Sequence, residues 1–214
     1  MFSIDLERYR LVDLSVRIDP PGTEERPLEV SVGRLADDSV KMDISNLHTH
    51  VGTHVEAPAH FFEGGALITD RPLTEFLGPA TLLSIDDPAE REVTGAIIDA
   101  HIGAVFQPGD ILLCRNAIVP SREQPEGRAT LTADAARWIV EHEVKLPAID
   151  RWFGLGRDVP ETRAVHDIIM GAGICIVEIV DLDALTKPRC WFMALPVAFA
   201  LDSGFARAIA LEER

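Results

Sequence analysis

The sequence predicts an α/β or α+β fold, with a mixed β-sheet at the centre of a single domain spanning residues 1–214. Two observations support this prediction. Apolar patterns typical of strands outnumber those typical of helices, and 214 residues is an ordinary length for one domain. A chain of this length can bury about 70% of its unfolded surface, so it needs no disulfide or structural metal to stabilise its core.

Short apolar segments bounded by turn residues predict the strands. They lie at residues 11–18, 79–85, 111–115, 144–149, 174–180, 192–199 and 205–211. The segment 111–115 is almost entirely apolar, which is typical of a strand buried on both faces. Residues 23–41 are charged and weakly patterned, and we interpret them as a loop or a mobile hairpin placed over the functional site. Residues 42–56 are expected to be extended.

Two segments have the apolar periodicity and the start signals of amphipathic helices. The first covers residues 131–143, with Thr132 as its cap. The second covers residues 160–170, with Asp158 as its cap and Pro160 in its first turn. Residues 73–77 are expected to form a short helix or turn, and residues 89–104 have no clear pattern.

Composition excludes several classes of partner. The formal net charge of −15 argues against nucleic acid or an anionic membrane surface, because both require a basic protein face. No apolar run reaches the roughly 18 residues of a membrane span, and the N-terminus lacks the apolar core of a secretory signal. The three cysteines, Cys114, Cys175 and Cys190, have no paired spacing, so we expect free thiols and a cytoplasmic protein.

Residues 48–60 contain most of the residues that could carry chemistry. Alternate side chains of an extended chain share one face, and this stretch places five ligand-type side chains at even positions: His48, His50, His54, Glu56 and His60. Imidazole and carboxylate groups on one face suit zinc, and also manganese or iron. A helix would also bring two of the histidines together, but Gly52 and Pro58 disfavour it. The remaining alternative is a histidine-rich polar loop that binds nothing.

Glu178 is a lone carboxylate inside the apolar segment 174–180. Burying an unpaired charge is costly, so Glu178 should have a partner: a base, a proton, a metal or an arginine. His166 lies one predicted helix upstream, and the connection between helix and strand can bring the two residues together.

The segment His50-Val-Gly-Thr-His54-Val-Glu56-Ala-Pro-Ala-His60 resembles the H-x-G-T-H-x-D-A-P-x-H signature of the cyclase family of metal-dependent hydrolases. That family includes bacterial kynurenine formamidase and isatin hydrolase. Further similarities extend over most of the chain, at residues 72–80, 109–113, 164–166, 176–178 and 195–196. The resemblance implies a swivelling β/β/α-type fold, a homodimer or homotetramer, and hydrolysis of the C–N bond of a small amide or ring substrate.

The resemblance also implies the roles of individual residues. It implies that one or two divalent ions, zinc first and manganese second, are held by His50, His54, Glu56, His166 and Glu178. His60 would be the catalytic base, which takes a proton from water and delivers it to the leaving nitrogen. Aromatic side chains suited to gripping a planar substrate are Phe61, Phe62, Trp152 and Phe153.

The sequence departs from the family pattern at three places. Pro20 precedes Pro21-Gly22, where formamidases have an aromatic residue. Glu56 stands where the signature has aspartate, which bears on whether one carboxylate can bridge two ions. Arg151, Trp152 and Phe153 follow Asp150, where the family usually has a nearby serine, which indicates a different substrate pocket. Two alternatives therefore stay open: a ring-closing or lactone-cleaving enzyme, and a metal- or ligand-binding protein without catalysis.

Overall fold

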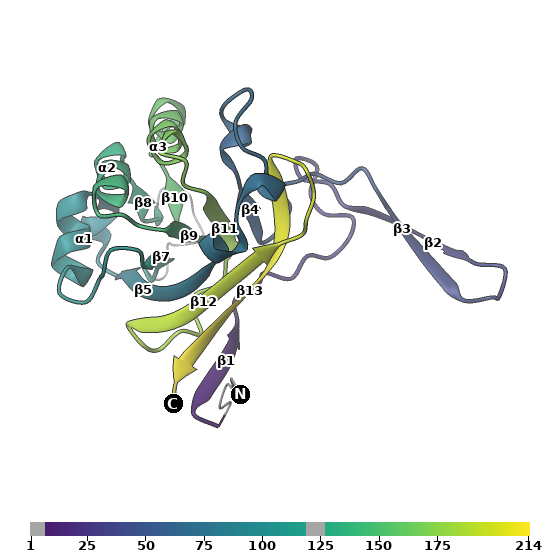
Figure 1. Cartoon of the computed structure of the whole chain (residues 1–214), viewed down its shortest axis with the longest axis horizontal. Helices are drawn as coiled ribbons and strands as arrows, with labels where there is room; N and C mark the ends of the chain where they lie inside the picture. The colour runs from purple at the N-terminus through teal and green to yellow at the C-terminus, as the bar shows by residue number, and fades with distance from the viewer. Residues whose placement is uncertain (1–6, 119–126) are drawn as a thin grey trace.

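The computed structural model describes residues 7–118 and 127–214 (Figure 1). Its strands are β1 Tyr9–Asp13, β2 Glu29–Arg34, β3 Val40–Ser45, β4 His54–Glu56, β5 Leu77–Ile85, β6 Glu92–Val93, β7 Ile111–Asn116, β8 Thr130–Leu131, β9 Leu146–Asp150, β10 Gly154–Leu155, β11 Ile176–Val180, β12 Arg189–Pro196 and β13 Ser203–Glu213. Its α-helices are α1 Gly95–Ile102, α2 Ala133–Glu141 and α3 Val159–Gly171. Short 3₁₀ turns are η1 Pro58–His60, η2 Ile68–Asp70, η3 Leu73–Phe76 and η4 Pro88–Glu90.

The main sheet closes into a barrel. Its strand order is β1-β13-β12-β5-β7-β9-β11-β4, and β4 also pairs with β13. β5, β7, β9 and β11 run parallel, whereas β12, β13 and β4 pair antiparallel with their neighbours. The predicted α/β class with a central mixed sheet is confirmed, and β4 is the strand that closes the ring.

Residues facing inward and outward from the barrel form two separate cores. Along β7, Ile111 and Leu113 belong to the core inside the barrel, whereas Leu112 and Cys114 belong to the core beneath the helices. Successive side chains of a strand point to opposite faces, so a strand covered on both faces must be apolar at nearly every position. The prediction that residues 111–115 are buried on both faces is confirmed.

The helices α1, α2 and α3 cover one side of the sheet (Figure 1). Thr132 accepts a hydrogen bond from the Ala135 N–H at the start of α2, and Asp158 accepts one from the Glu161 N–H at the start of α3. Both predicted caps are confirmed. The segment 89–104, which had no clear pattern, contains α1. None of the helices in the described residues is long and apolar enough to cross a membrane.

The strands β2 and β3 form a separate hairpin (Figure 1). Val30 lies opposite Ile44 and Val32 lies opposite Met42, so one face of the hairpin is apolar. Every residue of both strands is exposed. The prediction of a hairpin that begins within residues 23–41 is confirmed, but the second strand of the hairpin extends to residue 45. The strands of the hairpin extend away from the barrel, whereas the start of the segment lies beside the predicted site, where the Arg26 Nη1–H donates to the His50 carbonyl at 2.9 Å.

The other predicted strands and thiols are largely confirmed. Residues 79–85, 144–149, 174–180, 192–199 and 205–211 overlap β5, β9, β11, β12 and β13. Residues 11–18 form a strand only at their start, within β1, followed by an isolated bridge between Ser15 and Val180. The three cysteines are free, with Cys190 only half-buried.

Candidate metal centre

The strand β4 presents His54 and Glu56 on one face, because side chains two positions apart in a strand point the same way. Both residues are buried, and His54 Nε2 lies 3.3 Å from Glu56 Oε1. The His54 Nδ1–H donates to the Gly52 carbonyl at 2.7 Å, which leaves the lone pair on Nε2 for a ligand role. The shared face expected from the sequence therefore exists for this pair.

His50 reaches the same place from a turn. Residues 49–53 form turns and bends, so the expectation that they are extended is wrong. Gly52 has a φ of 64°, and a Cβ atom there would lie 2.0 Å from Ile18 Cδ1, so this turn requires glycine. The turn brings His50 Nδ1 to 2.7 Å from Glu56 Oε1. His48 lies outside this contact, where its Nδ1 accepts a hydrogen bond from the His50 backbone N–H.

A bulge in β11 sets the direction of Glu178. The register between β11 and β9 shifts between Val177 and Val180. Inside the bulge, Ile179 has a φ of 58°, which a β-branched residue rarely adopts, and strained positions of this kind cluster at functional sites. The half-buried Glu178 carboxylate lies beside the β4 pair, with its Oε2 atom 4.0 Å from His54 Nε2.

The helix α3 contributes His166 from its buried face. The His166 Nδ1–H donates to the Thr162 carbonyl at 2.7 Å, so Nε2 carries the free lone pair. That Nε2 atom lies 3.9 Å from Glu56 Oε2 and 3.9 Å from Glu178 Oε1. The structure thus brings His166 and Glu178 together, as the helix–strand connection led us to expect.

Two groups of donor atoms share Glu56. The first consists of His50, His54 and Glu56, and the second of Glu56, His166 and Glu178, with the donor atoms of each group within 4.8 Å of one another. Glu56 Oε1 contacts the first group and Oε2 faces the second. Bonds from zinc to nitrogen or oxygen are about 2.0–2.2 Å long, so two ligands of one ion lie at most about 4.4 Å apart. The separations of 3.2–4.0 Å between most of these donor atoms are in that range.

The surroundings of Glu56 Oε2 show whether a metal ion fits this site. It is buried, and it has no hydrogen-bond partner within the described part of the chain. Burying a charged oxygen without a partner is costly, whereas a divalent ion held together with His166 and Glu178 would satisfy it. Imidazole nitrogen and carboxylate oxygen are donors that zinc and manganese accept. The residues present therefore fit a divalent metal ion.

The electrostatics of the cluster also favour a cation. Burial alone would raise the pKa of Glu56, but the interactions with the His50 and His54 rings outweigh it and hold this pKa far below its usual value. Burial raises the pKa of Glu178 to about 8, and the negative charge of Glu56 adds to the rise. Burial lowers the pKa of His166, which favours the neutral ring that metal binding requires. A bound cation would let both carboxylates ionise together.

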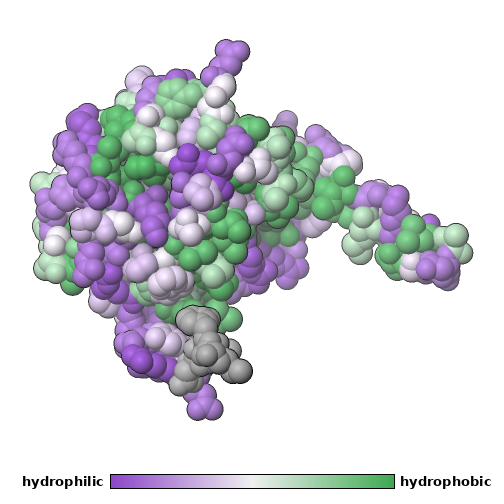
Figure 2. Space-filling model, viewed as in Figure 1, coloured by the Kyte–Doolittle hydropathy of each residue, from purple (hydrophilic) through white to green (hydrophobic). Residues whose placement is uncertain are grey.

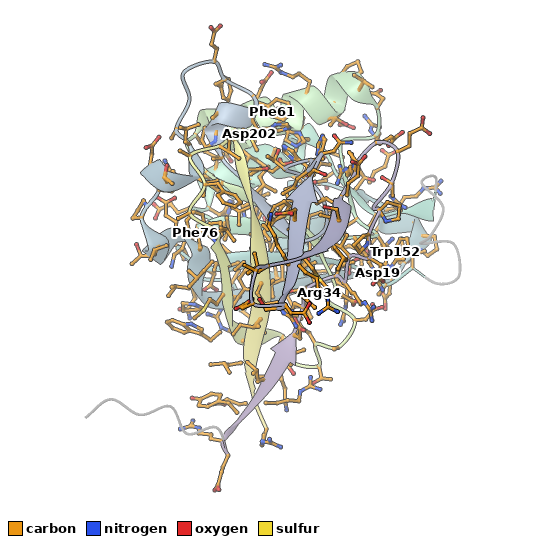
Figure 3. The ribbon with its side chains drawn as sticks, turned by 90° about the vertical axis from the view of Figure 1, so that its right-hand side faces the viewer. Asp19, Arg34, Phe61, Phe76, Trp152 and Asp202 are labelled. Atoms are coloured by element: carbon orange, nitrogen blue, oxygen red, sulfur yellow. The ribbon has the colours of Figure 1, made fainter. Side chains whose placement is uncertain are left out.

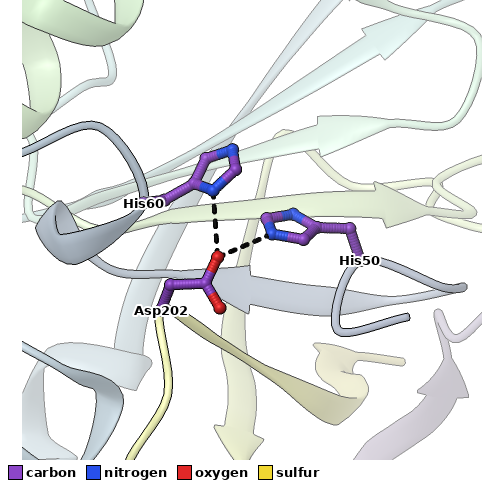
Figure 4. A group of neighbouring side chains, drawn as sticks. All are labelled: His50, His60 and Asp202. Atoms are coloured by element: carbon purple, nitrogen blue, oxygen red, sulfur yellow. Dashed lines mark hydrogen bonds and ion pairs between the residues drawn. The ribbon is translucent and has the colours of Figure 1, made fainter. Parts of the chain in front are cut away.

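Asp202 joins His60 to His50 (Figure 4). Its Oδ2 atom lies 3.0 Å from His60 Nδ1 and 3.0 Å from His50 Nε2. Burial alone would raise the pKa of Asp202, but the contacts with the two histidines outweigh it and lower this pKa. A charged Asp202 accepts the Nδ1–H of His60 and leaves His60 Nε2 as a basic lone pair. This is the arrangement of a general base oriented by a carboxylate.

Sequence reasoning missed Asp202 as a site residue. The pattern at residues 202–204 predicts a turn, and turn aspartates are common. In the structure, β13 pairs with β4 so that Ser203 lies opposite Glu56, and the Ala57 N–H donates to the Asp202 carbonyl at 2.8 Å. No short-range pattern in the sequence reports a pairing between strands that are so far apart in the chain.

The four aromatic residues predicted to bind substrate lie in two places. The Phe61 ring stacks on the His166 ring, with centroids 4.3 Å apart and an interplanar angle of 10°. Phe62 packs against the core beneath the helices. Phe153 is buried in that core, and Figure 3 shows Trp152 well apart from Phe61. The structure therefore does not gather the four into one pocket; Phe61 contacts a donor group, and Phe153 lines a cavity whose wall also includes His166 and Glu178.

The fold and the donor groups define a protein with a closed mixed barrel and a site suited to a divalent metal. The profile of the Cyclase family, described as "Putative cyclase", matches residues 12–153. This match covers more than half of the sequence, and the chain belongs to the Cyclase family. The predicted family is therefore confirmed.

Two kinds of relatives agree with this assignment. The chain is 27% identical to kynurenine formamidase from Bacillus cereus over 197 residues, which cover 88% of each protein. Isatin hydrolase A from Labrenzia aggregata superposes with a TM-score of 0.76 at 20% identity, covering 98% of this chain and 96% of that one. A structure described as a potential metal-dependent hydrolase with cyclase activity superposes with a TM-score of 0.73 at 22% identity, covering 96% and 99%. The cyclase-type fold implied by the resemblance is confirmed.

Glu56→Gln should weaken the affinity for zinc or manganese by at least tenfold, because it removes a carboxylate charge shared by both donor groups. Isothermal titration calorimetry of the metal-free protein measures this change. His101→Ala is the matched control, since His101 pairs with Glu90 away from both groups. Equal affinity in the wild type and Glu56→Gln would show that this carboxylate holds no metal.

Asp150, at the end of β9, should make stability depend on pH. Burial raises its pKa from 3.8 to about 6, so the folded protein retains a proton that the unfolded chain releases. The contribution of this proton is complete below pH 3.8 and is lost as the pH rises to about 6, a difference of about 3 kcal/mol. Urea unfolding at several pH values should show the wild type losing this stability relative to Asp150→Asn. Asp86→Asn, at an exposed carboxyl, is the control, and parallel curves for the wild type and Asp150→Asn would contradict the prediction.

Proposed function

We propose that the protein is a cytoplasmic metal-dependent hydrolase that cleaves the C–N amide bond of a small substrate, either an N-formyl aryl amine or a cyclic amide. Membership of the Cyclase family and the kynurenine formamidase and isatin hydrolase relatives support this proposal. The single observation that carries it is the Asp202–His60 pair next to two donor groups that share Glu56. The free thiols fit a reducing compartment.

The proposal assigns two metal positions, with zinc as the first choice and manganese as the second. One position is formed by His50, His54 and Glu56, and the other by Glu56, His166 and Glu178. When bound, a divalent ion would polarise the substrate carbonyl and make water more acidic. Because Glu56 contacts the first group through Oε1 and faces the second through Oε2, its longer side chain suits a shared role.

His60 handles the proton in this proposal. Its Nδ1–H is held by Asp202, so the Nε2 lone pair accepts the proton that the attacking water releases. The resulting imidazolium is stabilised by the Asp202 carboxylate and then gives the proton to the leaving nitrogen. The acyl carbon gains the water oxygen and the C–N bond breaks, so the products are a carboxylic acid and an amine.

The position of Glu56 also bears on the alternative of a protein without catalysis. That alternative depended on glutamate replacing the aspartate of the signature. Both oxygens of Glu56 are oriented towards donor groups, and the base pair of Asp202 and His60 is formed. These observations favour an active enzyme.

His60→Ala should lower kcat by about 100-fold or more while bound metal is retained, because it removes the proton-transfer group and no proposed ligand.

Asp202→Asn should lower kcat by at least tenfold, because the amide cannot stabilise the imidazolium. Formate or ring-opened product is measured from N-formylkynurenine, formanilide and isatin, and metal content by mass spectrometry. His142→Ala, at the C-terminal end of α2, is the control. Activity that survives complete chelation would contradict the metal-dependent mechanism. Loss of metal in His60→Ala would show that His60 is a metal ligand.

We also propose that the protein is a homo-oligomer in which the β2–β3 hairpin of one chain packs on a second copy. The apolar face of the hairpin is exposed, with Val32 and Met42 each 68% accessible, and a lone hairpin is at best marginally stable in water. Figure 2 shows hydrophobic surface along the hairpin. The same chain exposes further large apolar side chains in the segment that leads to Asp202: Leu195, Val197, Phe199 and Leu201.

Val32→Asp with Met42→Asp should reduce the mass in solution to that of one chain, because the charges must be desolvated at the contact. Light scattering after size exclusion measures the mass. Ser31→Asp, on the polar face of the same hairpin, is the matched control and should leave the mass of the assembly as it is. A wild-type protein with the mass of one chain would contradict the proposal.

A further inference from the structure

A cavity of about 440 Å³ lies beside the proposed metal centre. His166 and Glu178, both members of the second donor group, form part of its wall. The same cavity is lined by three arginines, Arg26, Arg128 and Arg151. A group bound in this cavity would therefore lie next to the proposed metal position and within reach of guanidinium groups.

Arg26 is held at the boundary between the cavity and the metal centre. Its Nη1–H donates to the His50 carbonyl at 2.9 Å, and its charge favours the ionised form of Glu178. A tight turn fixes its backbone, since the Arg26 N–H donates to Thr23 Oγ1 and the Arg26 carbonyl accepts from the Thr23 N–H. Among residues 7–118 and 127–214, no carboxylate lies within ion-pair distance of Arg26. Its charge is therefore available to a ligand.

Arg151 has an unused donor next to an unused acceptor. Its Nη2 pairs with Asp181 at 3.0 Å, but its Nε–H is buried and has no partner among the described residues. The neighbouring Asp150 is 2% exposed, and its Oδ2 atom likewise has no partner among them. Both residues line the cavity, and neither side chain has its full set of hydrogen-bond partners among the described residues, which is rare for buried polar groups.

We infer that this cavity binds a carboxylate carried by the substrate, through the guanidinium groups of Arg26 and Arg151, and thereby selects anionic over neutral amides. This inference rests on the proposed hydrolase function. Arginine matches a carboxylate with paired N–H donors, and such bonds are stronger than those between neutral groups. Arg151 belongs to the segment where the sequence departs from the family pattern, so the selectivity is a property of this chain.

The acidic groups on the cavity wall limit the charge of the ligand. Glu25, Asp150 and Glu178 line the cavity together with the three arginines. A dianion such as a phosphate monoester would meet repulsion from these carboxyl groups, whereas a monoanion can lie against the arginines alone. A carboxylate is thus the anion that the wall fits best.

The experiment compares formanilides that carry a carboxylate at ring position 2, 3 or 4 with the carboxamides of the same shape, and measures formate release by the metal-loaded enzyme. At least one carboxylate should exceed its carboxamide in kcat/KM by tenfold or more. Arg151→Gln should reduce that ratio by about 10- to 100-fold, the effect of losing one hydrogen bond to a charged group. Arg26→Gln should act in the same direction, and Arg151→Lys should restore part of the ratio. Metal content is measured for every variant.

Arg137→Gln is the matched control, because Arg137 lies on the exposed face of α2 and pairs with Asp134. A ratio near one in the wild type, or an equal loss on carboxylate and carboxamide in Arg151→Gln, would overturn the inference. If neither a formanilide nor isatin is hydrolysed, the proposed function fails, and calorimetric binding of benzoate to the metal-loaded protein decides the inference separately. Benzoate binding that is weaker in Arg151→Gln supports it, and equal binding overturns it.

Discussion

The pairing of β4 with both β11 and β13 is the interaction on which the site depends. β4 spans His54–Glu56, and it closes the barrel by hydrogen bonding to a strand on either side. Pairing with β11 places Glu178 opposite His54, and pairing with β13 places Asp202 next to the end of β4. Backbone hydrogen bonds in a closed sheet leave no free edge at this point, so the donor atoms are held on a rigid element rather than on a mobile loop.

The parts of the site that the sequence could predict are those set by local geometry. The spacing of His54 and Glu56 places them on one face of any strand, and Asp158 caps α3 because its carboxylate follows a general rule of helix starts. The lone charge of Glu178 in an apolar strand required a partner, and the physical cost of burial predicted that one would be found. These inferences need only a few neighbouring residues, and the structure agrees with each of them.

The parts that escaped prediction depend on contacts between distant segments. Asp202 reaches His60 because β13 pairs with β4, and nothing in the sequence around residue 202 specifies that pairing. His50 joins the cluster through a left-handed turn at Gly52, which interrupts the alternation from which the extended form was inferred. The apolar face of the hairpin β2–β3 likewise depends on cross-strand register, which places Val30 opposite Ile44 and Val32 opposite Met42.

The bulge at Glu178 and Ile179 places a strained residue beside the donor atoms, and hydrogen bonds hold that residue in place. A left-handed isoleucine is strained by about 1–3 kcal/mol, and an undistorted strand would avoid that strain. The Ile179 carbonyl accepts a hydrogen bond from Thr53 Oγ1, and Thr53 Oγ1 accepts one from the Val16 N–H, so three segments hold the strained residue in place. Thr53 lies directly before β4. The same contact therefore anchors the strand that carries His54 and the bulge that carries Glu178, which keeps the donor atoms of β4 and β11 in register with each other.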